Sequence, residues 1–235
     1  MGSSYTDKII ISVGGSLVVP GEGINTIFLS KLNSFIRDQL SKHPNRQFFL
    51  EVGGGATARQ YRDAGVEVIG HALKRDDLDW LGIHATRLNA QLIRTIFQDI
   101  AHPYLIKKYE IIRKVTEPVV VAAGWKPGWS TDYDAMLLCE DYGARTVLNL
   151  SNIKQVYTDD PKKNPDAKPI EKISWEEFRK IVGDEWTPGL NAPFDPIAAK
   201  KAQELGATVI VMSGDDFENI ENYFAGKPFV GTTIG

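Results

Sequence analysis

The stretch Gln47–Arg59, QFFLEVGGGATAR, decides how this chain folds. Its first half is a short, nearly continuous apolar run, which is typical of a strand covered on both faces. Three glycines, Gly53–Gly55, follow at the end of that strand, and a helical pattern begins directly after them. A glycine turn between a strand and a helix points backbone N–H groups at one place, where they bind phosphate. The stretch therefore predicts a parallel sheet with an anion site at its carboxyl edge, and Arg59 one turn into the helix suits phosphate oxygens.

The rest of the chain repeats this alternation of apolar runs and amphipathic segments. The predicted strands are Lys8–Val13, Gln47–Val52, Pro118–Ala123, Arg145–Leu150 and Ala207–Met212. The predicted helices are Asn25–Ser41, Ala56–Ala64, Asp76–Ile100, Asp132–Tyr142, Trp175–Ile181, Pro196–Leu205 and Asp216–Phe224. Such alternation predicts an α/β fold with a mostly parallel sheet sandwiched between helices.

Bulk properties set limits on what the protein does. The 235 residues suffice for one large domain or two closely packed lobes. A net charge of −3 argues against general binding of nucleic acid, which requires a basic excess. The single cysteine, Cys139, excludes an intrachain disulfide and fits a reducing, cytoplasmic location. No apolar run approaches the roughly 20 residues that span a bilayer, so no membrane is expected.

The polar stretch Tyr157–Lys172 is the clearest break in composition. Prolines at 161, 165 and 169 exclude a regular helix there. The stretch is either a surface loop or the boundary between two lobes of a single domain. The approximate lobes would be residues 1–150, which would bind the substrate, and residues 151–235, which would bind the nucleotide.

A second glycine cluster, Val13–Ser16, also ends a predicted strand. Glycines there allow close approach of an anion, although many strand–helix turns contain Gly-Gly for conformational reasons alone. Neither cluster matches the P-loop pattern or the dinucleotide-binding pattern. An ordinary P-loop NTPase and a Rossmann dehydrogenase are therefore disfavoured.

The segment Gly124–Asp132, GWKPGWSTD, follows the third predicted strand and opens a helix. Ser130 or Thr131 either caps that helix or donates to a ligand. Trp125 and Trp129 flank a Pro-Gly turn and are candidates for lining a ligand site. The other tryptophans, Trp80, Trp175 and Trp186, are interpreted as packing residues.

A fourth segment, Asn149–Lys163, runs from a strand through a polar turn to carboxylates and lysines. Its carboxylates would organise Mg²⁺ through water and its lysines would meet nucleotide phosphates, unless the segment is a solvated loop. The scattered histidines form no zinc motif.

Together these clusters resemble the amino-acid kinase superfamily, and within it the archaeal-type UMP kinases. The resemblance runs from Ile9–Ser16 to Gly231–Ile234. Its most specific pieces are Gly53–Arg59, Asp79–Ala90 and Pro127–Asp132, and Asn152, Val156-Tyr157 and Asp159–Pro161 complete the set. It implies a three-layer α/β/α sandwich, Mg²⁺–ATP as phosphoryl donor, UMP as acceptor, UDP as product for pyrimidine nucleotide biosynthesis, and a homo-hexamer built as a trimer of dimers.

The resemblance also implies residue roles. Arg59 and Lys163 would be the catalytic cations, and the protein itself would supply no metal ligand. The ATP-binding residues would be Gly15, Ser16, Gly55, Arg59, Ser151, Asn152, Tyr157, Asp160 and Lys163. The UMP-binding residues would be Gly54, Asp79, Trp125, Lys126, Pro127, Gly128, Trp129, Ser130 and Thr131, with Asp79 contacting the ribose hydroxyls.

The chain departs from the superfamily pattern at two positions. Ser12 stands where many members carry a lysine, and Ala56 stands where relatives often have Lys or Ser. Lys8 shares the strand face of Ser12 but lies about 13 Å away at about 3.3 Å per residue, too far to replace that lysine. Two alternatives stay open: a related small-molecule kinase of the superfamily, and a non-catalytic protein that binds a nucleotide or an oxyanion.

Overall fold

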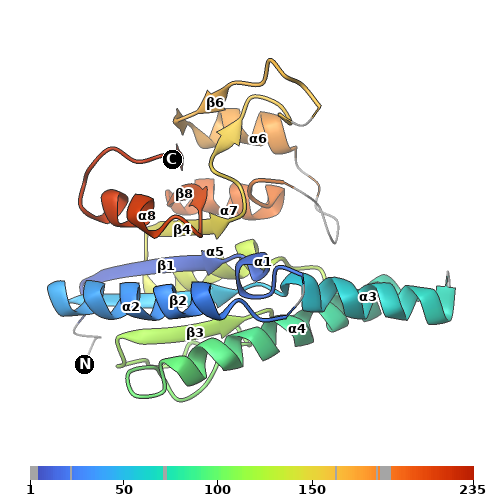
Figure 1. Cartoon of the computed structure of the whole chain (residues 1–235), viewed down its shortest axis with the longest axis horizontal. Helices are drawn as coiled ribbons and strands as arrows, with labels where there is room; N and C mark the ends of the chain where they lie inside the picture. Colours follow the sequence, from blue (N-terminus) through green and yellow to red (C-terminus); the bar gives the residue numbers. More distant parts are fainter. Residues whose placement is uncertain (1–4, 22, 71–72, 162, 184, 186–191) are drawn as a thin grey trace.

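A seven-stranded sheet with the order β3-β2-β1-β4-β8-β9-β7 forms the centre of the protein (Figure 1). The computed structural model describes residues 5–21, 23–70, 73–161, 163–183, 185 and 192–235. Neighbouring strands run parallel except β8 and β9. The strands are β1 (Asp7–Val13), β2 (Arg46–Val52), β3 (Val119–Ala123), β4 (Thr146–Ser151), β7 (Lys172–Ile173), β8 (Thr208–Ser213) and β9 (Thr232–Ile234).

Helices cover both faces of this sheet, which confirms the three-layer α/β/α sandwich. One core lies under α2, α4 and α8, and the other lies under α5, α6 and α7. In Figure 1, α3 projects beyond the sheet at the right of the view. The helices are α1 (Gly15–Val18), α2 (Thr26–Lys42), α3 (Gly55–Ile69), α4 (Arg75–Ile96), α5 (Thr131–Tyr142), α6 (Trp175–Val182), α7 (Pro196–Leu205) and α8 (Phe217–Phe224).

The continuous apolar runs are explained by this layering. Successive residues of a strand point to opposite faces, and here both faces are dry. In β1, Ile9 and Ile11 enter the first core while Ile10 enters the second. The apolar face of α2, formed by Leu29, Leu32, Phe35 and Ile36, packs in the first core, so it is core rather than interface.

The elements missing from the sequence prediction are short or depend on distant partners. The turn α1 and the strands β7 and β9 are each four residues or fewer, below the length at which periodicity is informative. Within the proline-rich stretch, β5 (Val156–Tyr157) pairs antiparallel with β6 (Pro169–Ile170) around an irregular loop. The prolines do exclude a helix there, as predicted.

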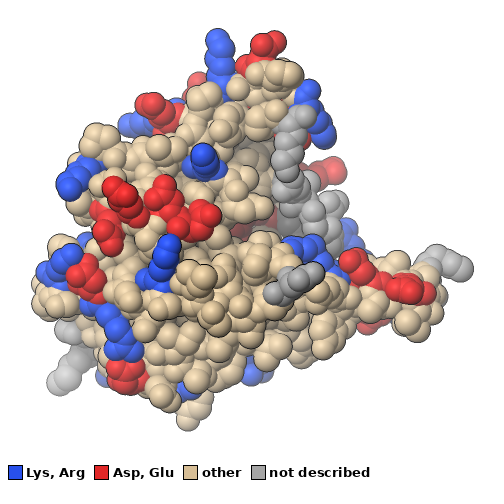
Figure 2. All heavy atoms as spheres, in the orientation of Figure 1, with Lys and Arg blue, Asp and Glu red and all other residues tan. Residues whose placement is uncertain are grey.

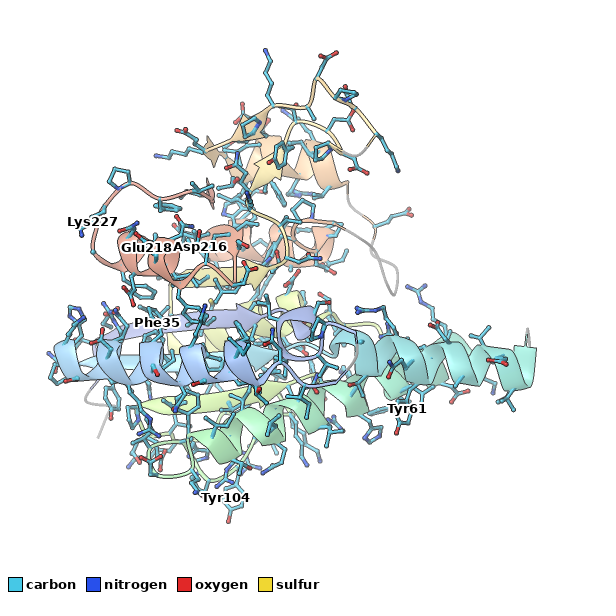
Figure 3. All side chains as sticks on the ribbon, in the orientation of Figure 1. Phe35, Tyr61, Tyr104, Asp216, Glu218 and Lys227 are labelled. Atoms are coloured by element: carbon cyan, nitrogen blue, oxygen red, sulfur yellow. The ribbon has the colours of Figure 1, made fainter. Side chains whose placement is uncertain are left out.

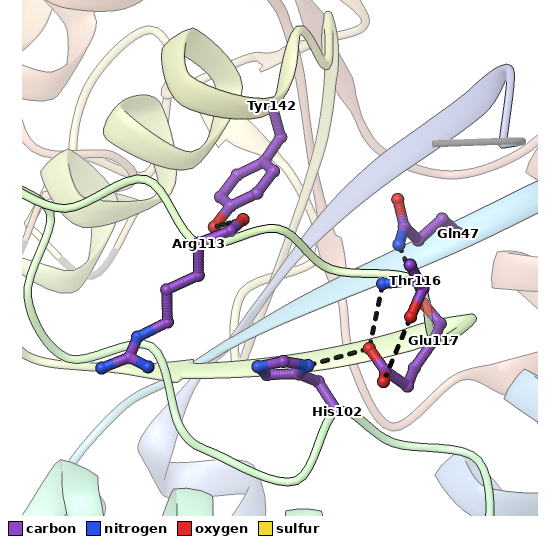
Figure 4. A network of polar contacts seen from close by, with 6 residues as sticks. All are labelled: Gln47, His102, Arg113, Thr116, Glu117 and Tyr142. Carbon is purple, nitrogen blue, oxygen red and sulfur yellow. Dashed lines mark hydrogen bonds and ion pairs between the residues drawn. The ribbon is translucent and has the colours of Figure 1, made fainter. Parts of the chain in front are cut away.

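The segment from Phe97 to Pro118 wraps around the exposed edge of β3. Backbone bridges join Ala101 to Val119 and Ile106 to Ala122. Near the start of β3, Nδ1 of His102 lies 2.8 Å from Oε2 of Glu117, and Gln47 donates to the Glu117 carbonyl at 2.8 Å (Figure 4). These contacts fix the segment, which then carries Tyr109 beneath the carboxyl end of the sheet.

The interpretation of the tryptophans as packing residues is right for one of them and wrong for another. Trp175 is buried and donates to the Ala207 carbonyl at 2.8 Å. Trp80 is 40% exposed, because it lies on the outer side of α4, where its ring contacts Arg87 and His84. Trp186 lies outside the described residues.

Surface charge is mixed on the face shown in Figure 2, where acidic side chains gather over α8. That helix carries Glu218 in its first turn, after Asp216 at its N-cap. Within the described ranges, none of the helices has the length and apolar character needed to cross a bilayer.

Candidate active site

The two glycine segments meet in space at the carboxyl end of β1 and β2. Gly53 donates its N–H to the Val13 carbonyl at 3.0 Å, and Ala56 donates to Val19 at 2.9 Å. A Cβ atom added to Gly15 would lie 2.6 Å from the backbone nitrogen of Gly54, so a side chain has no room there. The two glycine segments are therefore in direct contact at one end of the sheet.

A cavity of about 490 Å³ opens beside this junction. Its wall combines the start of α3, the first half of α4, the segment that leads into α5 and residues just before α7. The lining residues are Gly54, Gly55, Ala58, Arg59, Arg62, Asp79, Gly82, Ile83, Thr86, Gly124, Trp129, Ser130, Thr131, Asp132, Ala192 and Asp195. Elements that lie far apart in the sequence thus form one pocket at the end of the sheet where ligands of parallel sheets bind.

Arg59 bridges the glycine segments. Its guanidinium donates to Oγ of Ser16 at 3.3 Å and to the Pro20 carbonyl at 3.2 Å, and both contacts are exposed. One turn further along α3, Arg62 donates to the Leu78 carbonyl at 3.1 Å. Two guanidinium groups therefore line a cavity whose floor is backbone, an arrangement suited to phosphate groups.

The segment before α5 is held in place by buried polar groups. Gly124 donates to Oγ1 of Thr86 at 2.9 Å, and Gly128 donates to Oδ2 of Asp79 at 2.9 Å. Gly128 has a φ of +87°, a conformation that favours glycine. Ser130 accepts the N–H of Tyr133 at 3.1 Å and so caps α5.

The aromatic residues of this segment divide into two groups. Trp129 lines the cavity and lies 4.2 Å from the ring of Tyr133. Trp125 stacks between Trp129 and Tyr109, and the ammonium of Lys126 lies 3.9 Å from the centre of the Trp125 ring. Lys126, Pro127 and Gly128 lie outside the main cavity, and the last two line a neighbouring hollow of about 410 Å³ with Asp79.

Two carboxyl groups face each other on the cavity wall. Asp132 accepts from Ser12 Oγ at 3.4 Å and from the N–H of Asp195 at 3.0 Å. Burial, together with the charge of Asp195, raises the pKa of Asp132 to about 7. Lys8 donates to the Tyr142 carbonyl at the opposite end of the sheet, so it does not replace the lysine missing at Ser12.

The predicted nucleotide residues of the C-terminal part lie away from this cavity. Ser151 sits beside the first glycine segment, because a Cβ on Gly14 would be 3.4 Å from its Cα. Tyr157 belongs to the short ribbon of β5 and β6. Lys163 is 85% exposed and pairs with Asp160 at 3.9 Å, and Asn152 is also exposed.

Several side chains that build the site were not singled out from the sequence. Asn89 donates to the carbonyls of Gly53 and Gly54, at 2.9 and 3.1 Å. Arg87 donates to the carbonyls of Gly124 and Trp125, at 3.2 and 2.8 Å. Both lie in the Asp79–Ala90 segment of α4, but i and i+2 positions of a helix point in different directions, so their spacing does not identify their partners.

Known proteins resemble this chain over nearly its full length. The model of the amino acid kinase family matches residues 7–213. Uridylate kinase from Pyrococcus abyssi is 32% identical over 97% of this chain and 99% of its own length. Uridylate kinase from Methanocorpusculum labreanum is 31% identical over 97% and 95%, respectively. The crystal structure of uridylate kinase from Archaeoglobus fulgidus superposes with a TM-score of 0.80 at 29% identity, covering 97% of this chain and all of that one.

Proposed function

This chain belongs to the amino acid kinase family, and from that premise we propose that it is a UMP kinase, which transfers the γ-phosphoryl group of ATP to UMP and yields ADP and UDP. One observation carries the proposal. The first glycine segment touches the second, and Gly54 and Gly55 of the second line a cavity that Gly124 and Trp129–Thr131 also border, so a donor phosphate held by the first segment would lie next to an acceptor in the cavity. The uridylate kinases that resemble the chain over nearly its whole length support the same reaction.

We assign the acceptor to the side of the cavity formed by α4 and the segment before α5. There Gly54, Asp79, Trp129, Ser130 and Thr131 line the wall. Trp125, Lys126, Pro127 and Gly128 would support UMP from the layer behind. Asp79 already accepts from the N–H of Gly128, so its contact with the ribose would use the remaining lone pairs of its carboxylate.

We assign ATP to the opposite side, over α1 and the beginning of the loop that follows β4. Gly15, Ser16 and Gly55 would meet the phosphates, and Ser151 lies beside them. Asn152, Tyr157, Asp160 and Lys163 would surround the base, ribose and phosphates from the ribbon of β5 and β6. This assignment requires ATP to bridge from the glycine floor to the exposed ribbon.

The chemistry needs alignment and charge neutralisation more than a protein base, because a UMP phosphate oxygen is already ionised at neutral pH. Backbone N–H groups of the glycine segments, Arg59 and Lys163 would stabilise charge on the moving phosphoryl group. Among the residues that the structure describes, no group of three or more His, Cys, Asp or Glu is placed to hold a metal. Mg²⁺ would therefore bind chiefly to the ATP phosphates, whose charge it neutralises.

A panel of acceptors tests the proposal. ADP production would be measured with purified protein, Mg²⁺–ATP and each of UMP, dUMP, CMP, AMP, acetylglutamate and isopentenyl phosphate. We expect UMP to give the highest kcat/KM, with a pyrimidine nucleotide next. Turnover of a carboxylate or of isopentenyl phosphate instead would point to a related small-molecule kinase, and ATP binding without turnover of any acceptor would point to a non-catalytic binding protein.

We further propose that the chain assembles as a homo-hexamer, a trimer of dimers. Apolar side chains stay exposed along α3 and α4: Tyr61 at 62%, Val68 at 84% and Leu88 at 66% (Figure 3 shows Tyr61 pointing away from the body). Exposed apolar side chains that gather into a patch mark contact sites, so these residues are candidates for an interface. Light scattering should give about six times the 26.1 kDa of one chain, and Tyr61→Glu should lower that mass, whereas Val230→Glu on the exposed C-terminal surface should not.

The division of labour between lobes follows from these assignments. Residues 1–150 would bind UMP and form the oligomer, and residues 151–235 would bind ATP, although one sheet runs through both. The buried thiol of Cys139, whose pKa burial raises to about 12, suits the cytoplasm that we propose as the location.

A further inference from the structure

Two carboxyl groups are completely buried beneath the wall of the acceptor site. Glu51 lies on β2 and Asp134 lies on α5, and both are 0% exposed. Glu51 shares its sheet face with Phe49, so it points into the core between the sheet and α5. Buried carboxylates are costly unless they are paired and hydrogen-bonded, so this pair requires an explanation.

The hydrogen bonds of the pair leave one donor missing. Tyr109 donates to Oε2 of Glu51 at 2.7 Å, and the N–H of Trp125 donates to Oδ2 of Asp134 at 3.1 Å. The other two oxygens, Oε1 of Glu51 and Oδ1 of Asp134, are buried and meet no donor in the described part of the chain. One proton placed between two such acceptors would satisfy both, since one carboxyl then donates and the other accepts.

The surrounding charges favour that proton. Burial raises the pKa of Glu51 well above its usual range, and the charge of Asp134 raises it further. Burial also raises the pKa of Asp134 to about 8, against the opposing effects of the Trp125 N–H and of Arg87. One proton on the pair leaves one negative charge opposite one guanidinium. The charged or titratable groups that face the pair from the packed elements are Arg87 on α4, Tyr109 in the segment before β3, and Asp132, Tyr133 and Tyr142 on α5.

We propose that Glu51 and Asp134 share a single proton in a hydrogen bond between Oε1 and Oδ1, and that this acid pair positions the wall of the acceptor site. The proton comes from solvent as the chain folds and forms the O–H bond of one carboxyl group, while no bond between heavy atoms changes. The shared proton is argued from the buried pair alone, whereas the positioning of the acceptor site rests on the proposed function.

The link to the site runs through two consecutive residues. Asp134 accepts the N–H of Trp125, and Arg87 donates to the carbonyls of Gly124 and Trp125. The segment that begins there continues to Trp129 and Thr131 in the cavity wall. Glu51 and Asp134 are therefore positioning residues. Their hydrogen bond fixes the Asp134 carboxyl so that Oδ2 accepts the Trp125 N–H, and neither residue touches the substrate.

Amide substitutions test the shared proton because each mimics one protonated carboxyl. In Glu51→Gln, the amide donates to Asp134 Oδ1 while its oxygen still accepts from Tyr109. In Asp134→Asn, the amide donates to Glu51 while its oxygen still accepts from Trp125. In the double variant one NH₂ group is left over, so either the Trp125 N–H or the O–H of Tyr109, whose ring packs on Trp125, loses its acceptor. The single variants should therefore be mild and the double variant worse than their sum.

Infrared spectra and unfolding measured as a function of pH test whether Glu51 and Asp134 share a proton. Near pH 6, the spectrum of the wild type minus that of Glu51→Gln should show a C=O band of a buried protonated carboxyl, because the Asp132 band cancels in the difference, and the wild type minus the exposed control Glu176→Gln should not show it. The fall of stability between about pH 5 and about pH 8 should be shallower in Glu51→Gln than in the wild type. Two ionised carboxylates around a water or a cation would give no such band, and equal slopes in both proteins would also overturn the shared proton.

Steady-state kinetics test whether the pair positions the wall of the acceptor site. Each single variant should keep the KM for UMP within about threefold, and the double variant should raise it about tenfold or more while kcat changes less than about threefold. Multiplicative effects of the two changes, or a fall in kcat alone, would remove the pair from positioning. If the wild type failed to turn over UMP, the proposed function would fail, and the spectra and unfolding curves would still decide the proton.

Discussion

The two ends of the parallel sheet are built in opposite ways. At the amino end, side chains pair with neighbouring elements: Arg46 with Asp7 at 2.7 Å, and Lys8 with the Tyr142 carbonyl at 2.8 Å. At the carboxyl end, glycines replace side chains, and the carboxyl groups of Asp132 and Asp195 lie close together. Paired polar groups stabilise the fold, whereas bare backbone donors and crowded carboxyls reduce stability and prepare a place for a ligand.

The largest effect should come from adding a side chain at the carboxyl end of the sheet, where the two glycine segments touch. Gly15→Ala should destabilise the protein by about 3 kcal/mol or more, because the added Cβ meets rigid backbone of the other glycine segment. Gly21→Ala is a matched control, since a Cβ there meets nothing within 4 Å, and it should change stability by less than about 0.5 kcal/mol. Urea unfolding midpoints compare the two, and equal midpoints would contradict the close contact.

Removing the bridging guanidinium should affect catalysis without affecting folding. Arg59→Ala should lower kcat by about 10²- to 10³-fold, the range found when a donor to a developing charge is lost. Its melting temperature should match the wild type, because both of its contacts are exposed. Arg145→Ala removes an exposed guanidinium at the amino end of β4 and should leave kcat unchanged. A near-normal rate in Arg59→Ala would exclude Arg59 from the reaction.

The crowded carboxyls predict a pH dependence of stability. Folding raises the pKa of Asp132 to about 7, mainly through burial, so the native state keeps a proton that the unfolded chain releases near pH 4. That contribution is complete below about pH 4 and falls by about 1.4 kcal/mol per pH unit up to about pH 7. Asp132→Asn should flatten the curve of unfolding free energy against pH in this window.

A carboxyl near the amino end of the sheet, Asp99, serves as a control because its pKa shifts in the opposite direction to that of Asp132. The guanidinium of Arg37 lowers the pKa of the exposed Asp99 to about 2, so its contribution is present above about pH 4 and is lost as the pH falls. Asp99→Asn should therefore change stability at neutral pH and leave the slope above pH 4 as in the wild type. Parallel curves for Asp132→Asn and the wild type would contradict the assigned proton.

The smallest effect should come from a paired group at the amino end. Glu117→Gln weakens the contact with His102 and should lower stability by about 1 kcal/mol. Because the contact lies at the opposite end of the sheet from the cavity, kcat and the KM for UMP should not change. Denaturation and steady-state kinetics on the same preparation check both statements, and a kinetic effect would show that the segment after α4 communicates with the site.

Most of the fold could be predicted because its main signals are local. The boundaries of β1, β2, β3, β4 and β8 differ from the predicted strands by a single residue at most. The glycine segments were also found, since a strand, glycines and a helix that follow one another are a local pattern typical of phosphate binding. The contact between those segments follows from the parallel order of β1 and β2, whose carboxyl ends lie at one edge of the sheet.

The polar layer under the site could not be predicted in the same way. Glu51 was visible as a charge inside an apolar strand, and Asp134 as one acidic residue in a helix's first turn, a common and unremarkable position. Their burial and shared environment depend on Tyr109, which reaches them through the segment that wraps around β3. No spacing in the sequence encodes that meeting.

The sequence by itself determined the layers, the order of strand and helix, and the glycines at two strand ends, because residue periodicity and backbone freedom act over a few neighbouring residues. Only the tertiary structure decided which carboxyls are buried, which protons they keep and that Arg62 joins Arg59 on the cavity wall. Those properties depend on distance and dielectric between residues remote in the chain, and packing alone sets both.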